Sequence, residues 1–360
     1  MDTIPRRRRR NGSRGIRHLS AIPGLRLGEG VPMDRRRVLS LLAAVTMSQA
    51  VGAQPRTKPA RIGYLVTAET SQGGRLKDEF RRALVALGYV EGRDFVLEVR
   101  SAEGRIERFA ELAAELVRLE PDVIVAPATP QALAARKATS KIPIVAPTMG
   151  DPVGDGLVAT LARPGGNVTG LTFLATELVG KRLTLLAEAV PALRRVAVLW
   201  QPGAYAETTT NEMRQQLEVA AKRLNVHVQQ VDVRRPDELD EAFAVIAHAN
   251  VNALMVLPAT MLFNLQARIA GLATKAKLPA IGIDRGFAEA GGLMSYGASI
   301  RDLFRRGAAY VDKILKGARP GELPVERPTT FELVINLKTA RELSLEFPAT
   351  IRARADDEIT

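Results

Sequence analysis

The 360-residue chain contains no cysteine, few aromatic residues and only three histidines. The lack of cysteine excludes disulfides, thiolate zinc sites, cysteine nucleophiles and a lipid anchor at a lipobox cysteine. Aromatic residues make up 4% of the chain, which leaves little stacking surface for single-stranded nucleic acid. His227 and His248 lie in the body of the chain, and neither has the neighbouring carboxylate or histidine of a metal site. The sequence therefore predicts no metal and no cofactor.

The motifs of several enzyme classes are also absent. No GxGxxG motif follows the first predicted strand, and no G-x-S-x-G elbow occurs. Residues 163–167 (RPGGN) lack the P-loop pattern and precede a strand, so they predict a tight turn. These absences favour a protein that is not an enzyme.

The net charge of +12 is concentrated at the N-terminus. Residues 1–53 contain eleven arginines and three acidic residues, which leaves 40 basic and 36 acidic residues in the remainder. A nucleic-acid-binding domain would carry its basic excess on the folded body. The nearly balanced body therefore predicts no nucleic-acid partner.

Residues 33–53 have the parts of a signal peptide. Arg35, Arg36 and Arg37 form a basic segment, residues 38–45 form an apolar segment, and residues 51–53 supply small residues before Gln54. The apolar run is too short for a comfortable membrane span. The paired arginines also fit a loose twin-arginine pattern, so the general secretory and twin-arginine routes both stay open. We predict export to the periplasm, with a disordered basic N-terminus as the alternative.

Residues 1–32 precede this leader and include five consecutive arginines at positions 6–10. A block of like charge is typical of a solvated, disordered segment. We interpret these residues as an over-long gene assignment, with translation starting at Met33. A nucleic-acid-binding tail is the alternative interpretation.

From residue 61 onward, short apolar runs alternate with helical patterns. The first series predicts strands at 62–66, 95–99, 123–125, 142–146 and 168–173, with helices near 76–88, 106–119, 131–139 and 153–161. The second predicts strands at 196–200, 226–233, 253–257 and 280–283, with helices near 179–190, 213–224, 239–246 and 262–272. A helix at 300–315 and a strand at 331–335 follow.

Such alternation predicts parallel sheets covered by helices on both faces. The expected fold class is α/β, with two doubly wound parallel-sheet lobes. We place lobe 1 at residues 58–171 plus 291–325 and lobe 2 at residues 172–290 plus 326–348. Residues 349–360 are expected to form a tail.

The loops at the carboxyl ends of the predicted strands form the expected ligand site, because loop amides and helix N-termini point at that edge. These loops are rich in Thr, Ser, Ala, Pro and Gly and contain few charges. This composition suits hydrogen-bonded capture of a small polar or zwitterionic solute better than acid–base catalysis. The candidate ligand-binding residues are Thr67, Ser71, Thr129, Gln131, Thr148, Asp151, Tyr205, Thr260 and Asp284.

Several of these candidates have a second interpretation. Thr129 is expected to cap a helix that has Pro130 in its first turn, and the free amides of that turn would suit a carboxylate. Asp151 and Asp284 would bind an amine, or equally serve as loop caps or partners of an arginine. Tyr205 would pack over a cyclic part of the ligand, or be an ordinary half-buried tyrosine.

Five segments resemble one protein family. Residues 148–158 (TMGDPVGDGLV) and 161–170 (LARPGGNVTG) carry the resemblance, together with 61–65, 87–92 and 331–340. Over roughly residues 58–345 the chain resembles the TrpX/TrpY-like family of ABC-transporter substrate-binding proteins. The resemblance implies a type I periplasmic binding fold with three hinge crossings and no catalysis. Some relatives are associated with aromatic amino acids, so the expected solute is an amino acid or aromatic compound.

We therefore expect a monomer that captures a small solute and then docks on an ABC permease in the inner membrane. The lobes would close about crossings near residues 169–174, 292–299 and 325–331. One alternative is a sensor that presents the solute to a membrane receptor. A cleft enzyme of the α/β type would need paired acid–base groups, and a transcription regulator would need a DNA-binding motif where the signal peptide lies.

Overall fold

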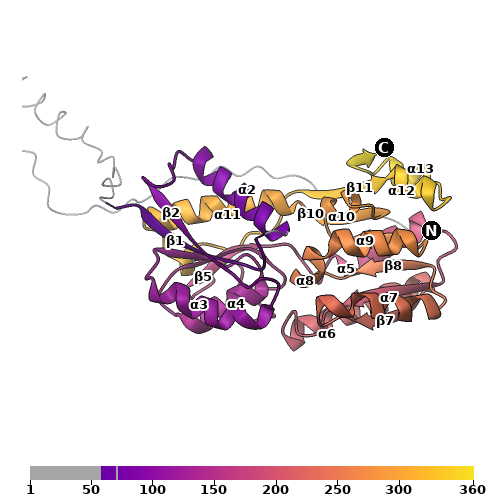
Figure 1. The fold of residues 1–360 in the computed structure, drawn as a ribbon, viewed down its shortest axis with the longest axis horizontal. Helices are drawn as coiled ribbons and strands as arrows, with labels where there is room; N and C mark the ends of the chain where they lie inside the picture. The colour runs from indigo at the N-terminus through magenta and orange to yellow at the C-terminus, as the bar shows by residue number, and fades with distance from the viewer. Residues whose placement is uncertain (1–57, 70–71) are drawn as a thin grey trace, which may run out of the picture. The chain divides into compact units, whose positions relative to one another are not determined.

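A computed structural model describes residues 58–69 and 72–360 (Figure 1). The first sheet has the strand order β2-β1-β3-β4-β5, and all of its pairings are parallel. Its strands are β1 (Ala60–Val66), β2 (Phe95–Ser101), β3 (Val123–Val125), β4 (Ile144–Met149) and β5 (Val168–Thr172). The helices of this lobe are α2 (Gln72–Ala86), α3 (Phe109–Arg118) after the 3₁₀ turn η1 (Ile106–Arg108), α4 (Thr129–Ala138) and α11 (Ile300–Leu315).

Both faces of this sheet are covered, as its continuous apolar runs predict. Tyr64 of β1 belongs to the core that includes Phe80 of α2 and Phe304 of α11, whereas Leu65 belongs to the core under α3 and α4. Side chains alternate between the faces of a strand, so a run buried on both faces must be apolar throughout. The prediction of a two-faced sheet in lobe 1 is confirmed.

The second sheet has the order β12-β11-β10-β9-β8-β6-β7. Its strands are β6 (Arg195–Trp200), β7 (His227–Asp232), β8 (Ala253–Val256), β9 (Ala280–Gly282), β10 (Met294–Ala298), β11 (Phe331–Asn336) and β12 (Asp357–Ile359). Only the β10–β11 pairing among them is antiparallel, because β11 enters after the chain has passed through the other lobe.

The helices of the second lobe cover its sheet in two groups. One core joins α5 (Val179–Ala189) and α6 (Glu207–Leu224) to one face. Another joins α7 (Leu239–His248), α8 (Thr260–Asn264), α9 (Gln266–Lys275) and α10 (Arg285–Glu289) to the other face. The remaining elements are η2 (Pro236–Glu238), η3 (Pro320–Glu322), α12 (Leu337–Glu342) and α13 (Ala349–Arg352).

The chain passes between the two lobes three times. The passages lie at residues 173–178 between β5 and α5, at Ser299 between β10 and α11, and at 327–330 before β11. The first and third passages are tied together, since Thr172 N donates to Glu326 O at 3.0 Å and Glu326 N donates to Gly170 O at 3.1 Å. The structure thus has three passages close to the positions expected from the sequence.

Three details differ from the expected boundaries. Residues 291–298 were assigned to lobe 1, but β10 pairs with β9 and β11 in the second sheet. Residues 349–360 were expected to be a tail, but they contain α13 and β12, which pairs with β11. The predicted helix at 153–161 is a series of turns, because Gly156 adopts a φ of +67° and ends the single turn that begins at Asp151.

Gly170→Ala should destabilise the protein. Gly170 has a φ of +138°, and a Cβ there would contact the backbone of Ala146. We expect a loss of more than about 1 kcal/mol in the free energy of unfolding, measured by urea denaturation. Gly271 of α9 provides the matched control, because nothing lies near the position of an added Cβ. Gly271→Ala should raise the free energy of unfolding by about 0.5–1 kcal/mol. Similar effects of the two substitutions would contradict this account of Gly170.

Candidate functional site

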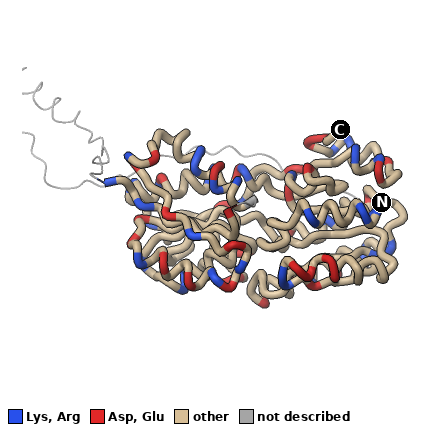
Figure 2. Tube along the Cα trace, in the orientation of Figure 1, with Lys and Arg blue, Asp and Glu red and all other residues tan. Residues whose placement is uncertain are grey.

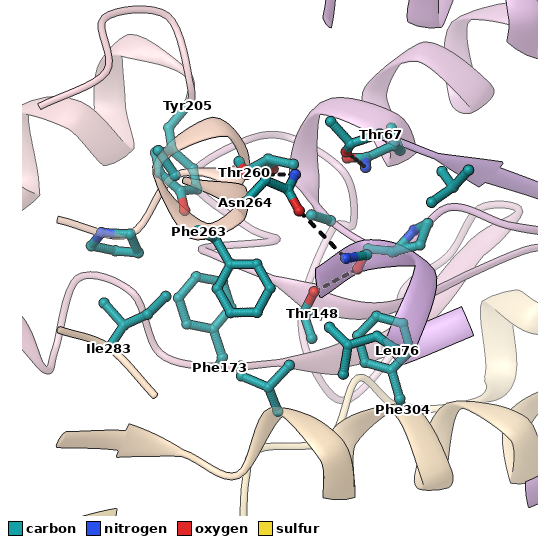
Figure 3. A pocket seen from close by; sticks show the side chains of 18 residues that line it. Thr67, Leu76, Thr148, Phe173, Tyr205, Thr260, Phe263, Asn264, Ile283 and Phe304 are labelled. Atoms are coloured by element: carbon teal, nitrogen blue, oxygen red, sulfur yellow. Dashed lines mark hydrogen bonds between the residues drawn. The ribbon is translucent and has the colours of Figure 1, made fainter. Parts of the chain in front are cut away.

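A cavity of about 80 Å³ lies where the carboxyl ends of the strands in both lobes meet (Figure 3). Lobe 1 supplies the ends of β1 and β4 and the starts of α2 and α4, and lobe 2 supplies α8 and the loops after β6, β8 and β9. The lining comprises Val66, Thr67, Gly73, Leu76, Pro127, Ala128, Gln131, Thr148, Phe173, Tyr205, Pro258, Ala259, Thr260, Phe263, Asn264, Ile283, Ile300 and Phe304. None of these residues is Asp, Glu, Lys or Arg.

Aromatic and aliphatic side chains form much of the wall. Phe173 comes from the first passage, Phe263 from α8 and Phe304 from α11, and Figure 3 shows them projecting into the same space as Leu76 and Ile283. The helices α8 and α11 belong to different lobes and meet only because the chain passes between the lobes. The site can therefore hold the apolar part of a ligand between the lobes.

Three polar side chains cluster on the lobe 1 wall. Gln131 Nε2 donates to Thr67 Oγ1 at 3.1 Å, while Gln131 Oε1 is buried without a hydrogen-bond partner among the described residues. Thr148 Oγ1 donates to Pro127 O at 2.7 Å. Gln131 Oε1 is thus an acceptor that a ligand N–H or O–H would satisfy.

Polar groups also join the lobes across the cavity. Gly73 N of α2 donates to Asn264 Oδ1 of α8 at 3.4 Å, and Asn264 Nδ2 donates to Thr260 O at 3.0 Å. The dashed lines of Figure 3 mark both bonds. Residues of opposite lobes therefore meet directly at the site.

Five of the nine predicted ligand residues line this cavity, namely Thr67, Gln131, Thr148, Tyr205 and Thr260. Ser71 lies outside the described residues. Thr129, Asp151 and Asp284 lie elsewhere, and each has a partner in the backbone.

Thr129 does not cap α4 as predicted. It is the first helical residue, Ala128 takes the N-cap position without a side-chain bond, and Thr129 Oγ1 instead accepts from Gly150 N at 3.0 Å. The hydroxyl thus ties α4 to the end of β4. Pro130 does lie in the first turn, as expected.

The two aspartates act as loop and helix caps. Asp151 Oδ1 accepts from Gly154 N at 2.9 Å, and Thr209 Oγ1 of the other lobe donates to Asp151 Oδ2 at 3.4 Å. Asp284 Oδ2 accepts from Gly286 N at 3.3 Å at the start of α10. Burial raises the pKa of Asp284 to about 6.

Asp284 faces a second cavity of about 350 Å³, which adjoins the first because Leu76, Phe263 and Ile300 line both. Unlike the first cavity, the second is lined by charged residues of both signs. Its Arg285 is already paired, with Asp357 at 2.7 Å and Glu332 at 3.7 Å.

The apolar wall was not predicted. The predicted site residues follow strands, whereas four residues of the wall project from helices, namely Leu76, Phe263, Asn264 and Phe304. Phe263 and Asn264 lie one helical turn beyond the predicted Thr260, so the spacing of three and four residues was an available signal.

The lobes also touch beside the cavity. Tyr205 of lobe 2 packs against Gly150 of lobe 1. Asp155 Oδ1 of lobe 1 accepts from Ala206 N at 2.9 Å, and Ala206 is the N-cap of α6, which has no side-chain cap of its own. A carboxylate at a helix N-terminus is favourable, although burial raises the pKa of Asp155. This contact therefore stabilises the lobes in their present arrangement.

Residues 68–359 match the family of ABC transporter substrate-binding proteins. The chain belongs to this family. The Tyrosine-binding protein of Clostridioides difficile (strain R20291) is 26% identical over 289 residues, which cover 80% of this chain and 82% of that protein. Members of the family bind small solutes, and the resemblance predicted from the sequence is confirmed.

Solved structures confirm the fold. A conserved domain protein from Vibrio cholerae O1 biovar El Tor is 29% identical with a TM-score of 0.76, covering 84% of this chain and 100% of that one. The ABC domain from Streptococcus pneumoniae in complex with L-Trp is 24% identical with a TM-score of 0.76 and the same coverage. The chain has the type I periplasmic binding fold.

Within residues 58–69 and 72–360, no group of three or more His, Asp or Glu is arranged to hold a metal ion. None of the helices there combines the length and apolar content needed to cross a membrane.

Gly150→Ala should weaken the contact between the lobes without unfolding either one. A Cβ at Gly150 would overlap the ring of Tyr205, which lies in the loop just after Trp200. Because Trp200 is the only tryptophan, acrylamide quenching of its fluorescence reports on that loop. We expect stronger quenching in Gly150→Ala than in the wild type and little change in melting temperature.

Gly166→Ala is the matched control, since nothing lies near its Cβ. It should leave quenching unchanged. Equal quenching in all three proteins would show that Tyr205 does not depend on Gly150.

Proposed function

We propose that this protein is the exported component of an ABC transporter that captures an aromatic amino acid between its lobes. The observation that carries the proposal is a cavity whose walls combine phenylalanine rings with hydroxyl and amide groups and contain no Asp, Glu, Lys or Arg. Such a lining favours a ligand with a ring and a few hydrogen-bonding groups. The relatives that are named for tyrosine or hold L-Trp support the same class of solute.

The ring of the solute would lie among Phe173, Phe263 and Tyr205. Aromatic pairs contribute about 0.5–1.5 kcal/mol beyond the area they bury, so such a cluster discriminates a ring from an aliphatic side chain. Burial raises the pKa of Tyr205, so its hydroxyl stays protonated and serves as a donor.

Gln131 would provide the acceptor for a polar group of the solute. Its Oε1 is buried without a partner in the part of the chain that the structure describes, and its Nε2 donates to Thr67, which fixes the orientation of the amide. A site with a preset acceptor rejects ligands that lack the matching donor, because the acceptor then stays unpaired.

The solute enters by separation of the lobes. The cavity of about 80 Å³ is smaller than the 300–1,000 Å³ typical of ligand pockets, and residues of both lobes close over it. Rotation about the three passages would open it, and the contacts made only when the lobes meet would then favour the loaded form.

The remaining parts of the proposal concern the cell. Export would use the leader at residues 33–53, which lies outside the described residues, and would deliver a periplasmic monomer. The loaded form would dock on an inner-membrane permease.

Basic and acidic residues are interspersed along both lobes (Figure 2), a distribution that does not suit nucleic acid. The uncharged lining offers no acid–base pair, which supports binding without catalysis.

A thermal-shift screen tests the solute class. L-tyrosine, L-tryptophan and L-phenylalanine at 1,000 times their Kd would each add about 4 kcal/mol to the free energy of unfolding and raise the melting temperature by several degrees. Sugars and purines should have no effect. A shift with a sugar or purine and none with the aromatic amino acids would overturn the proposal.

Gln131→Leu should weaken binding of the best of these amino acids about tenfold, because a lost hydrogen bond costs about 1 kcal/mol or more. Isothermal titration calorimetry measures the loss. Gln215→Leu, on the exposed side of α6, is the control and should bind as the wild type does.

A further inference from the structure

The turn at residues 151–156 of lobe 1 reaches the start of α6 in lobe 2. Asp155 of this turn is 6% exposed, and its Oδ1 accepts from Ala206 N at 2.9 Å. Ala206 is the N-cap of α6, and its own side chain makes no cap bond. The first amides of a helix have no partner within the helix, so an acceptor from outside stabilises the helix start. Lobe 1 therefore supplies an acceptor that α6 lacks.

A second contact joins the same two segments. Thr209, which is fully buried in the first turn of α6, donates from Oγ1 to Asp151 Oδ2 at 3.4 Å. Gly154 lies beside this bond, since a Cβ there would be 2.9 Å from Thr209 Oγ1. The turn thus approaches α6 closely along its whole contact.

Bonds within lobe 1 fix the shape of the turn. Asp151 Oδ1 accepts from Gly154 N at 2.9 Å, and Asp155 N donates to Asp151 O at 2.8 Å. Arg136 of α4 also donates to Gly156 O. None of these bonds uses the carboxylate of Asp155, so that group is presented to lobe 2 by a turn that forms without it.

The contact is separate from the solute site. Asp151, Asp155, Ala206 and Thr209 line neither of the two cavities, although Tyr205 beside Ala206 lines the first. The contact therefore forms when the lobes meet, whatever solute lies between them. A contact made only in the closed form raises the population of that form, with or without a solute.

We propose that Asp151 and Asp155 form a latch with Ala206 and Thr209 that holds the lobes together and slows the release of a captured solute. The latch also raises the share of closed molecules before a solute binds. This inference goes beyond the proposed function, because the latch acts on closure and not on the choice of solute. Asp155 is a positioning residue, since it acts on the solute only through the movement of the lobes.

Removal of the acceptor tests the latch. Asp155→Ala should release the best-bound of L-tyrosine, L-tryptophan and L-phenylalanine about tenfold faster, which is the usual size of the effect of removing a helix cap. Association should not slow, because the contact forms only after the solute has entered. Asp155→Asn should release the solute less than threefold faster, since its side-chain oxygen can still accept from Ala206 N.

Fluorescence energy transfer between the lobes measures both quantities. The chain has no cysteine, so Lys137→Cys on α4 and Gln215→Cys on α6 place one dye at an exposed site of each lobe (Figure 1). Without solute, Asp155→Ala should have a smaller closed population than the wild type and Asp155→Asn. Stopped-flow mixing of the same labelled proteins with the amino acid gives the rates of association and release.

Ala206→Pro removes the donor instead of the acceptor. Ala206 has a φ of −59°, which proline also adopts, so the start of α6 keeps its shape. The variant should release solute as fast as Asp155→Ala does, and the double variant should be no faster than either one. Additive effects in the double variant would show that the two groups do not act through one bond.

Asp237→Ala is the control for loss of an aspartate. Asp237 is exposed on lobe 2 and pairs with Arg235 of the same lobe, so its loss should change no rate by more than twofold. If Asp155→Ala does not fold, Ala206→Pro decides, because it leaves the turn of lobe 1 intact.

The outcomes separate the latch from the proposed function. An unchanged closed population and release rate in Asp155→Ala would overturn the latch, and so would slower association with unchanged release. Failure of the wild type to bind any of the three amino acids would instead overturn the proposed function. The closed population without solute would then still decide whether the latch exists.

Discussion

The backbone pairing between residues 170–172 and Glu326 is the constraint on which the rest of the arrangement depends. Two hydrogen bonds hold the first and third passages side by side, and the second passage at Ser299 leads directly into α11. Because these two passages are hydrogen-bonded to each other, rotation about them is the movement of the lobes that we expect. The same passages carry Phe173 and Ile300 into the cavity, so the hinge is also part of the wall.

The site separates its apolar and charged functions in space. The first cavity has no Asp, Glu, Lys or Arg in its described lining, so a ring can be buried there without desolvating a charge. Charged side chains line the adjoining second cavity instead, and Asp284, Arg285 and Glu332 are among them.

Much of the fold was predictable because local patterns and topology agree. The predicted helix at 300–315 coincides with α11, and the apolar run at 62–66 predicts the fully buried part of β1. The prediction was wrong at 153–161, where hydrophobic spacing resembles a helix but Gly156, with a φ of +67°, ends the turn that begins at Asp151. The strand at Asp357–Ile359 was missed because its polar sequence carries no strand pattern and it forms only by pairing with β11.

The candidate site was predictable only where it follows from strand ends. Thr67 and Tyr205 lie in loops after β1 and β6, Thr148 lies near the end of β4, and the structure brings all three to one cavity. The helical phenylalanines Phe263 and Phe304 were not predicted, because their pattern is that of ordinary core residues.

The central claim is that a solute is captured by closure of the lobes. Small-angle X-ray scattering of the purified protein, alone and with saturating L-tyrosine, tests it most directly. The account predicts a smaller radius of gyration with the amino acid than without it, because the lobes come together around the bound solute. An unchanged radius at demonstrated saturation would contradict capture by closure.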